Sequence, residues 1–425
     1  MPVTVPNAPI SSQDVISGYV NRSWRFLAEL QLSSGMEFVI GASEGSYLWN
    51  VERTHRLLDC GNAGGVHSLG HRNPELLATL RDAFEYHDAG IWCMPTAESL
   101  ALQDALTAMA PHPSLSRCVT TLSSTDSIDL ALMFARRCTG RKKWVAYRHG
   151  YHGHGGLAAL VTGSDYDGQI EHYSLSRSET RFFEQYDDAP AVTRLLDGEC
   201  AALILELVNF ETFKPASPSF VEEIAADCRR KGILLIVDET RTGLGRSGLP
   251  WLTSHYPLAP DIIILGKGLG GGLYPVSAIV TTQPIYDRCL NEGHWGFSSS
   301  MACSPVGSLI AAKVLEMIQR PALVANVKHL ETSLTREFAL LCDEFPDIFA
   351  PGWVLGAIAA LQLRKPGARE AILPALFKRG VMCHSISQID PAVVKFLPCL
   401  TSETSVVTEL AAALRGFAAE QSAAL

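Results

Sequence analysis

Two short apolar runs, each of which leads into a charged residue, constrain the fold of this chain more than any other feature. The first is ILLIV at residues 233–237, followed by Asp238, and the second is IIIL at 262–265, followed by Gly266 and Lys267. Short runs rich in isoleucine, leucine and valine are typical of strands that are buried on both faces of a parallel sheet. We therefore expect Asp238 and Lys267 to stand at the ends of neighbouring buried strands.

A carboxylate and an amine in such positions are costly to bury unless a ligand uses both charges. Pyridoxal phosphate is a cofactor that does so. A lysine amine forms a Schiff base with its aldehyde, and a carboxylate pairs with its protonated pyridine nitrogen. The sequence therefore predicts a pyridoxal phosphate site with Lys267 and Asp238 as its catalytic residues. Glycines on both sides of Lys267 would let the backbone approach the ring.

Composition excludes several classes of protein. The chain has 425 residues, of which 47% are hydrophobic and 19% charged, and this indicates a compact enzyme of more than one domain. A net charge of −9 without basic blocks argues against nucleic acid or an anionic membrane as the main partner. The cysteines form no C-x-x-C motif, and the start MPVTVPNAPISSQD lacks the features of a signal peptide. We expect a cytoplasmic protein without a membrane span.

Helical and strand-like segments alternate through the middle of the chain. Helical periodicity covers residues 98–109 and 127–137, and strand-like runs fall at 118–122, 144–147, 202–207 and 276–280. Such alternation predicts an α/β fold with a mostly parallel central sheet in a large domain and helices on both faces. We expect an N-terminal arm and part of a smaller α+β domain in residues 1–60, a large cofactor-binding domain in 61–310, and the C-terminal small domain in 311–425.

Seven segments, in order along the chain, carry a resemblance to a known family. They are GSYLWNVERTHRLLDC (45–60), HSLGHRNPEL (67–76), LSSTDSID (122–129), YHG (151–153), ILELVNFE (204–211), VDETRTGLGRSG (237–248) and LGKGLGGG (265–272). Together they resemble the class III aminotransferases, which are fold type I pyridoxal phosphate enzymes and include ornithine and 4-aminobutyrate aminotransferases. The fifth segment resembles the family motif E-P-x-Q-G-E, and the last resembles the segment that holds the cofactor lysine.

The resemblance implies a phosphate site at LSSTDSID. Ser124 and Thr125 fall where a strand leads into a helix, and backbone N–H groups and hydroxyls at a helix start suit a phosphate. An ordinary helix cap formed by Ser124 and Ser127 is the alternative interpretation.

The resemblance also implies residues around the cofactor ring. Tyr151 is expected to stack on the ring with His152 beside it, unless Tyr151 is a core aromatic residue. Glu206, at the end of a buried strand, is expected to support the polar network near the ring. Arg241 is expected near the 3′ oxygen of the cofactor, where its charge would stabilise a phenolate; a solvated arginine is the alternative.

Near the expected substrate, Lys395 departs from the family pattern, whereas Glu211 keeps it. The segment KFLPCL places Lys395 where the family has an arginine that commonly clamps a carboxylate. Lysine cannot form the planar two-bond fork that arginine offers. Glu211 keeps the acidic position that pairs with this arginine in some relatives, so a contact between Glu211 and Lys395 is expected.

A threonine that reaches the phosphate from the partner subunit in the family has no clear counterpart here. In GHWGFSSSMACSP the ungapped position falls on Trp295. One of the serines at 298–300 is expected to supply the hydroxyl, with Ser299 as the representative choice.

We therefore expect an aminotransferase that moves an amino group between an amine donor and a carbonyl acceptor, in a homodimer with shared active sites. The altered carboxylate clamp favours an amino sugar or another carboxylate-free compound, in the biosynthesis of a specialised metabolite. Epimerisation, aminomutase chemistry and dehydration with the same cofactor stay open, because the fate of the proton on Cα depends on pocket geometry.

Other readings fit less well. Residues 243–248 spell the dinucleotide fingerprint G-x-G-x-x-G, but DETRT separates them from the preceding strand, which disfavours an NAD-binding oxidoreductase. The three histidines in 149–154 lack carboxylate or cysteine partners at ligand spacing, so no metal site is expected. A non-catalytic relative is disfavoured because Lys267 and Asp238 are both present.

Overall fold

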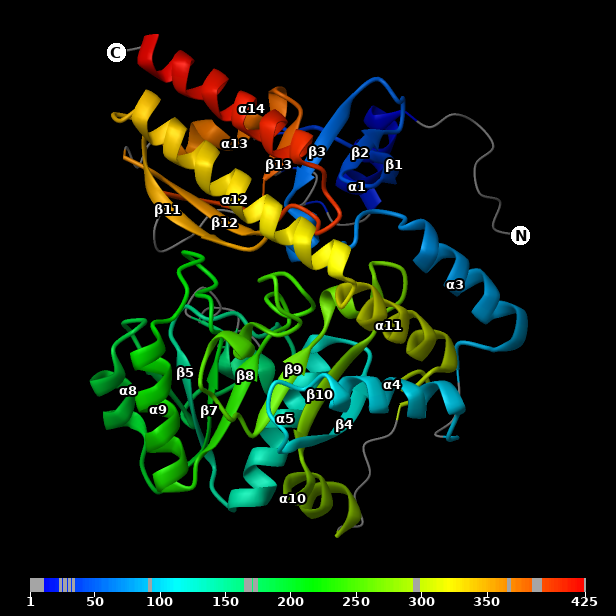
Figure 1. Ribbon diagram of the computed structural model, residues 1–425, viewed down its shortest axis with the longest axis vertical. Coiled ribbons are helices and arrows are strands. Elements are labelled where there is room, and N and C mark those ends of the chain that lie inside the picture. Colours follow the sequence, from blue (N-terminus) through cyan, green and yellow to red (C-terminus); the bar gives the residue numbers. More distant parts are fainter. Residues whose placement is uncertain are drawn as a thin grey trace.

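The computed structural model describes residues 11–22, 25, 29, 32, 35–90, 94–163, 170, 175–292, 299–364, 368–383 and 392–423. A larger part of the molecule carries a seven-stranded sheet, and a smaller part carries a four-stranded and a three-stranded sheet. In Figure 1 the smaller part lies above the larger one, and helix α11 (Pro305–Ile318) lies where the two meet.

The seven-stranded sheet is mostly parallel. Its strand order is β4-β10-β9-β8-β7-β5-β6, and β10 runs antiparallel to both β4 and β9. The remaining neighbouring pairs are parallel. The strands are β4 (Leu115–Thr121), β5 (Lys143–Tyr147), β6 (Thr180–Phe183), β7 (Cys200–Leu205), β8 (Leu234–Asp238), β9 (Ile262–Leu265) and β10 (Ser277–Thr282). The expected α/β fold with a mostly parallel central sheet is confirmed.

Helices cover both faces of this sheet, and each face has its own core. Helices on one face are α3 (Pro74–Tyr86), α4 (Ala97–Ala108), α8 (Ala189–Leu195), α9 (Pro218–Lys231) and α11. Helices on the other face are α5 (Ser124–Thr139), α6 (Ala158–Val161) and α10 (Gln283–Tyr286), followed by the π-turn η5 (Asp287–Asn291). Within β8, Leu235 and Val237 enter the first core and Ile236 the second. Both faces need apolar side chains, which explains why the strand sequences do not alternate with polar residues.

The smaller part is built from both ends of the chain. Its four-stranded sheet has the order β1 (Ile40–Glu44), β2 (Tyr47–Asn50), β3 (Arg56–Cys60) and β13 (Val381–Cys383), in which β13 pairs with β3 in parallel. Its antiparallel sheet has the order β11 (Phe349–Leu355), β12 (Ile358–Leu363) and β14 (Val393–Phe396). The expected domain limits near residues 60 and 310 stay a prediction.

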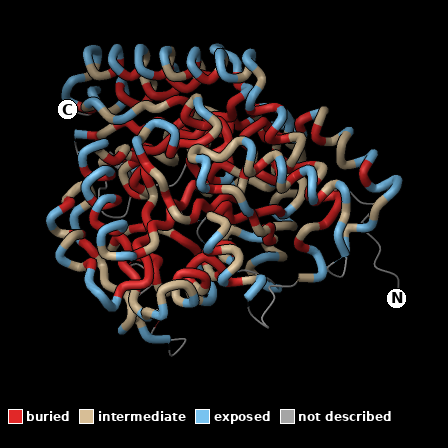
Figure 2. The backbone as a smooth tube through the Cα atoms, turned by 60° about the horizontal axis from the view of Figure 1, so that its bottom comes forward, coloured by how far each residue is buried: buried red, intermediate tan, exposed pale blue. Residues whose placement is uncertain are grey.

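The remaining helices surround these two sheets. They are α1 (Ser12–Arg22), α12 (Pro321–Glu344), α13 (Ala368–Lys378) and α14 (Thr404–Ala423). Side chains from α12, α13 and α14 share one core with strands of both small sheets. Figure 2 shows buried backbone through the interior and exposed residues on the outer turns of the helices. In the described part of the chain, no helix is long and apolar enough to cross a membrane.

Three short 3₁₀ segments complete the described elements: η1 (Asn62–Gly64), η3 (Leu252–His255) and η4 (Lys267–Gly270). The last of these begins at the lysine that the sequence singled out. This segment begins two residues after the last residue of β9, so that lysine lies at one edge of the large sheet.

Candidate active site

The carboxyl ends of the parallel strands meet at one edge of the large sheet, and polar side chains gather there. Asp238 is the last residue of β8, Lys267 is the second residue after β9, and Glu206 directly follows β7. Tyr151 and His152 follow β5 in a loop. Ligands of open α/β sheets bind at this edge, so the strand order itself assembles the site.

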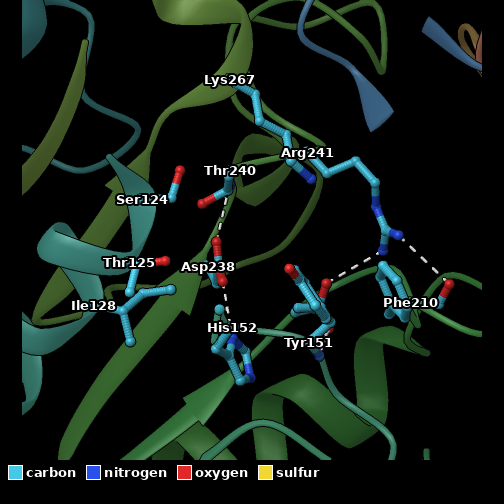
Figure 3. A pocket seen from close by; sticks show the side chains of 12 residues that line it. Ser124, Thr125, Ile128, Tyr151, His152, Phe210, Asp238, Thr240, Arg241 and Lys267 are labelled. Carbon is cyan, nitrogen blue, oxygen red and sulfur yellow. Dashed lines mark hydrogen bonds and ion pairs between the residues drawn. The ribbon is translucent and has the colours of Figure 1, made fainter. Parts of the chain in front are cut away.

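A cavity of about 190 Å³ opens between these strand ends. Figure 3 shows Lys267, Asp238, Ser124 and Thr125 arranged around the same space. The cavity is lined by Ser124, Thr125, Ile128, Tyr151, His152, Gly153, Glu206, Phe210, Asp238, Thr240, Arg241 and Lys267. The structure thus brings together eight of the residues that the sequence singled out: Ser124, Thr125, Tyr151, His152, Glu206, Asp238, Arg241 and Lys267.

Lys267 is half-buried and held in an uncommon backbone conformation. Its φ is 44°, in the left-handed region that non-glycine residues seldom adopt and that tends to cluster at functional sites. Desolvation and the positive charge of Arg241 together lower the pKa of the Lys267 amine to about 8, although the charge of Asp238 opposes this. The amine is therefore much closer to neutrality at physiological pH than an exposed lysine.

The glycines beside Lys267 serve close packing. A Cβ on Gly266 would lie 2.0 Å from Ser124 Oγ, and a Cβ on Gly268 would lie 2.2 Å from Ser68 Oγ. Both distances are far below van der Waals contact, so only glycine allows the lysine segment to sit against the start of α5. The sequence predicted that these glycines let the backbone approach a ring, whereas the close contacts in the structure are with serine side chains.

Asp238 and His152 form a buried ion pair in the floor of the cavity. The Asp238 Oδ2 to His152 Nδ1 distance is 2.8 Å, and the Thr240 backbone N–H donates to Asp238 Oδ1 at 3.0 Å (Figure 3). Burial opposes ionisation of Asp238, but the hydrogen bond and charge of His152 outweigh it, so the pKa of Asp238 lies below its ordinary value. Burial likewise opposes protonation of His152, but Asp238 raises the pKa of His152 above its ordinary value. Asp238 is therefore ionised at neutral pH, and its charge favours the protonated form of His152.

The start of α5 faces the other side of the cavity. Ser123, rather than Ser124, caps the helix. Its side-chain oxygen accepts a hydrogen bond from the Asp126 N–H, and the Asp126 carboxylate accepts one from the Ser123 N–H. The alternative in which Ser124 and Ser127 form the helix cap is therefore wrong. Ser124 and Thr125 are the first two helical residues, whose N–H groups have no partner within the helix. The macrodipole of a helix of this length favours an anion at that point.

Glu206 and Arg241 form a second buried pair. Arg241 donates from one terminal nitrogen to Glu206 Oε1 at 3.2 Å, and the Tyr151 N–H donates to Glu206 Oε2 at 3.2 Å. Burial raises the pKa of Glu206, although Arg241 and His152 oppose this. Burial lowers the pKa of Arg241, although Glu206 and Asp238 oppose this. Arg241 is only 5% exposed, so the alternative of a solvated arginine is wrong.

Phe210, Thr240 and Ile128 line the cavity but were missed in the sequence. The Phe210 ring stacks on Tyr151 with a centroid distance of 5.0 Å and an interplanar angle of 20°. A signal for Phe210 did exist, because it stands in ILELVNFE at the glycine position of E-P-x-Q-G-E. A phenylalanine in place of glycine adds a large apolar side chain beside the site.

Lys395 and Glu211 are buried near Phe210 but do not line the cavity. The Lys395 amine, on β14, donates to the Phe210 carbonyl oxygen at 3.1 Å and lies 4.8 Å from the centre of the Phe210 ring. Glu211 is 3% exposed, and its N–H donates to Asn209 Oδ1. Their expected roles toward a substrate, and the expected contact between them, stay predictions.

Ser299 is described by the structure but does not line the cavity. Its hydroxyl accepts from the N–H groups of Met301 and Ala302 at 3.3 and 3.2 Å. A role toward the phosphate of a partner subunit stays a prediction, and Trp295 and Ser298 lie outside the described residues.

The dinucleotide interpretation is wrong. Residues 240–247 form turns, and no helix opens at the G-x-G-x-x-G sequence as that fingerprint requires. Of the three histidines in 149–154, His152 is engaged by Asp238. Among the residues with described positions, no three His, Cys, Asp or Glu side chains are arranged to hold a metal ion.

Comparison with known proteins now adds the family. The family model for class III aminotransferases matches residues 31–416. An uncharacterised aminotransferase of Archaeoglobus fulgidus is 30% identical over 388 residues, covering 91% of this chain and 89% of the relative. The LysW-aminoadipate semialdehyde/glutamate semialdehyde transaminase of Sulfolobus acidocaldarius is 29% identical over 378 residues, covering 87% and 92%. An acetylornithine aminotransferase of Archaeoglobus fulgidus is 28% identical over 330 residues, covering 77% and 84%.

Solved structures show the same fold. A transaminase from the marine bacterium Virgibacillus superposes with a TM-score of 0.81 at 19% identity, covering 90% of this chain and 93% of that one. The ornithine δ-aminotransferase of Plasmodium falciparum superposes with a TM-score of 0.80 at 19% identity, covering 98% and 100%. The chain belongs to the class III aminotransferase family of fold type I and is a pyridoxal-phosphate-dependent enzyme.

The residues present fit this cofactor. A half-buried lysine amine with a pKa of about 8 and an ionised buried carboxylate line one cavity, as an aldehyde and a pyridinium require. The free N–H groups at the start of α5 face the same cavity and suit a phosphate.

Proposed function

We propose that this aminotransferase acts on a carboxylate-free amine or carbonyl compound, such as an amino sugar, in the biosynthesis of a specialised metabolite. The observation that carries the proposal is the wall of the cavity at Phe210. An aromatic ring lines the cavity there, and Lys395, at the position of the carboxylate-clamping arginine, points its amine at the carbonyl oxygen of Phe210.

Each polar residue of the cavity then has a task. The N–H groups and hydroxyls of Ser124 and Thr125 would hold the cofactor phosphate. The carboxylate of Asp238, kept ionised by His152, would hold the proton on the ring nitrogen. The guanidinium of Arg241, fixed by Glu206, would lie near the 3′ oxygen of the ring.

Lys267 would bind the cofactor covalently through its amine and move a proton at the substrate carbon. When bound, pyridoxal phosphate supplies the electron sink that makes this carbon acidic. A pKa of about 8 places the amine near the range in which it can both accept and donate a proton at neutral pH.

A second candidate comes from the relatives. Two of them are named for semialdehyde or acetylornithine substrates, which would place a terminal aldehyde or amine at the reacting position. Such compounds carry their carboxylate far from the reacting carbon, so the apolar wall that Phe210 forms near the ring does not exclude them.

An amine screen in a single turnover tests the proposal. The cofactor-loaded protein is mixed with one amine at a time, and the loss of visible absorbance and the carbonyl product are followed by spectroscopy and mass spectrometry. We expect faster conversion with amino sugars than with ornithine or 4-aminobutyrate. Faster conversion with N-acetylornithine supports the second candidate. Conversion of the amine without loss of the visible absorbance, so that the amino group does not stay on the cofactor, supports epimerisation or elimination.

We also propose a homodimer in which each subunit completes the active site of the other. A second cavity reaches Lys267 and Ser124 along the segment 272–276, and the same segment borders Met301. Met301, Met94 and Leu100 are 39%, 67% and 59% exposed and offer apolar surface that a partner subunit would cover. Sedimentation should give a dimer for the native protein and a monomer for Leu100→Glu combined with Met94→Glu.

A cytoplasmic location is proposed as well. The cysteines that the structure describes are all free thiols, as a reducing compartment favours. Fractionation of the cells that produce the protein tests this.

A further inference from the structure

We propose that a chain of buried hydroxyl groups, formed by Thr121, Ser127 and Ser277, positions Lys267 for its reaction with the cofactor. Ser277 is the positioning residue that acts on the lysine segment directly, and none of the three residues lines the cavity around Lys267. The inference rests on the proposed role of Lys267 and is independent of the proposed substrate class.

The three hydroxyl groups lie where the strands of the large sheet end near the cavity. Thr121 is the last residue of β4, and Ser277 is the first residue of β10, opposite Thr121 in the antiparallel pair. Ser127 lies in the first turn of α5, and Figure 1 shows α5 against β9, β10 and β4. All three residues are at most 1% exposed, so their hydroxyl groups depend on partners inside the protein.

The hydroxyl groups form one continuous hydrogen-bonded chain. Thr121 Oγ1 lies 2.7 Å from Ser127 Oγ, which lies 2.8 Å from Ser277 Oγ. Ser277 donates its single hydroxyl proton to the carbonyl oxygen of Leu265, so it accepts from Ser127. Ser127 in turn accepts from Thr121, whose hydroxyl oxygen also lies 3.1 Å from the Ser123 carbonyl oxygen. The chain therefore runs in one direction and ends on Leu265.

Leu265 is the residue through which the chain reaches the lysine. It is the last residue of β9, and Lys267 is two residues further along. A Cβ on Gly266, the residue between them, would lie 2.0 Å from Ser124 Oγ and 3.0 Å from Ser277 Oγ. The backbone before Lys267 is thus in close contact with α5 and with β10 at once.

The backbone of Lys267 needs support of this kind. Its φ of 44° lies in the left-handed region, which a residue with a side chain keeps only where the surrounding structure enforces it. A fixed Leu265 carbonyl restricts the rotation of the peptide groups between Leu265 and Lys267. Because the direction of the amine depends on this backbone, the hydroxyl chain determines where the amine meets an aldehyde.

Stability alone does not account for three hydroxyl groups in this place. A buried hydroxyl group loses its hydrogen bonds to water, and a bond within the protein does little more than offset that loss. Small apolar side chains would fill the same space without this cost. A connected and fully bonded chain of hydroxyl groups does, however, make the surrounding core rigid and specify one arrangement.

The rate at which cofactor-free protein captures pyridoxal phosphate tests the proposal. Stopped-flow absorbance is measured at pH 9, above the pKa of about 8 of the Lys267 amine, for native protein, Ser277→Ala and Thr281→Val. Thr281 is the matched control, because its buried hydroxyl lies on the same strand and donates to the Asp261 carbonyl oxygen at 2.9 Å, just before the start of β9. We expect capture to be roughly tenfold slower in S277A, because a small displacement of a reacting group is costly, and to be native in T281V.

Pyridoxal, which has the aldehyde but no phosphate, separates the lysine from the phosphate site. This arm is needed because Ser127 belongs to α5, whose start faces the cavity. S277A should capture pyridoxal roughly tenfold more slowly than the native protein does. A deficit with pyridoxal phosphate alone would place the effect at the start of α5 and overturn the proposal.

A double-mutant cycle tests whether the hydroxyl groups act as one chain. Ser127→Ala removes the donor to Ser277 but leaves the bond to Leu265, so capture should slow by only about threefold. The S127A/S277A variant should be no slower than S277A, because both substitutions break the same chain. If the two effects multiply, the hydroxyl groups act independently and the proposal fails. S127A and T281V carry the test if urea unfolding shows that S277A does not fold.

Two further results would overturn the role of Ser277. One is native capture by folded S277A, and the other is an equal loss in T281V, which would make the effect a general consequence of a lost buried hydrogen bond.

The outcome is separable from that of the proposed role of Lys267. Borohydride reduction and mass spectrometry show whether the cofactor is attached covalently in Lys267→Ala. If it is, the proposed role of Lys267 fails, whatever the serine variants do. If K267A captures nothing and S277A captures at the native rate, the role of Lys267 stands and that of Ser277 fails.

Discussion

At the Asp238 end of the cavity, buried charges are held by opposite charges and by backbone N–H groups, whereas at the Phe210 end two cations pack against aromatic rings. The first end suits one invariable ligand, because a pyridinium and a phosphate need fixed charges at fixed places. The second end presents an apolar surface to whatever lies against it. The comparison teaches that fixed charges gather at one end of the cavity and an apolar surface at the other, and we propose that the first end sets the reaction type and the second the choice of substrate.

Replacement of Lys267 should break the reactive end completely. Lys267→Ala removes both the covalent attachment and the group that moves the proton, so turnover should fall by roughly 10⁴-fold. The purified native protein should be yellow, and the variant should lack the absorbance of lysine-bound cofactor. Native absorbance and turnover in K267A would show that another residue binds the cofactor.

Loss of His152 should have the next largest effect. His152→Ala leaves the Asp238 carboxylate buried without its charged partner, which costs about 3 kcal/mol of unfolding free energy at pH 7. Asp238 has a lowered pKa and His152 a raised one, so the pair stabilises the folded protein at neutral pH. This stabilisation is lost as the pH falls and Asp238 becomes protonated. Urea unfolding of the cofactor-free protein should therefore show a deficit that shrinks toward low pH. A deficit that grows in acid would contradict an ionised Asp238.

The pH dependence of cofactor capture should sharpen the description of Lys267. Only the neutral amine attacks an aldehyde, and the pKa of this amine is about 8 in the folded protein. Capture by cofactor-free protein should thus rise about tenfold from pH 7 to a plateau above pH 8. Stopped-flow absorbance measures this rate. A rate that still rises steeply at pH 10 would indicate an ordinary, solvated lysine.

The start of α5 offers the smallest and most selective test. Ser123→Ala removes the helix cap and should lower the unfolding free energy by about 1 kcal/mol, with little change in cofactor affinity. Ser124→Ala should leave stability almost unchanged and weaken cofactor binding several-fold, because its hydroxyl faces the cavity. Unfolding curves and cofactor titrations of both variants distinguish the two serines. If Ser124→Ala lowered the unfolding free energy and Ser123→Ala weakened cofactor binding, Ser124 would be the capping residue.

Much of the reactive end could be predicted from the sequence. Apolar runs that end in Asp238 and Lys267 can be recognised without a structure, because buried charges at strand ends are costly and therefore informative. The fold class follows from the alternation of strands and helices. The capping role of Ser123 was not predicted, and the alternative interpretation placed the cap one residue later, at Ser124.

The substrate-facing end could not be predicted in this way. The sequence shows Phe210 in place of a glycine and Lys395 in place of an arginine, but not that one covers the other. That contact joins the loop after β7 to strand β14, which is 185 residues further along the chain. Nothing local in the sequence specifies a distance between such segments.

The sequence by itself determined the type of fold and the chemistry at Lys267 and Asp238, because both depend on residue type and on position at a strand end. Only the tertiary structure decided the partners of these groups. It placed His152 on Asp238, Ser124 against the lysine segment, and the Phe210 ring over Arg241 and Lys395. The physical reason is that burial and pairing are properties of packed neighbours, and packing brings together residues from distant parts of the chain.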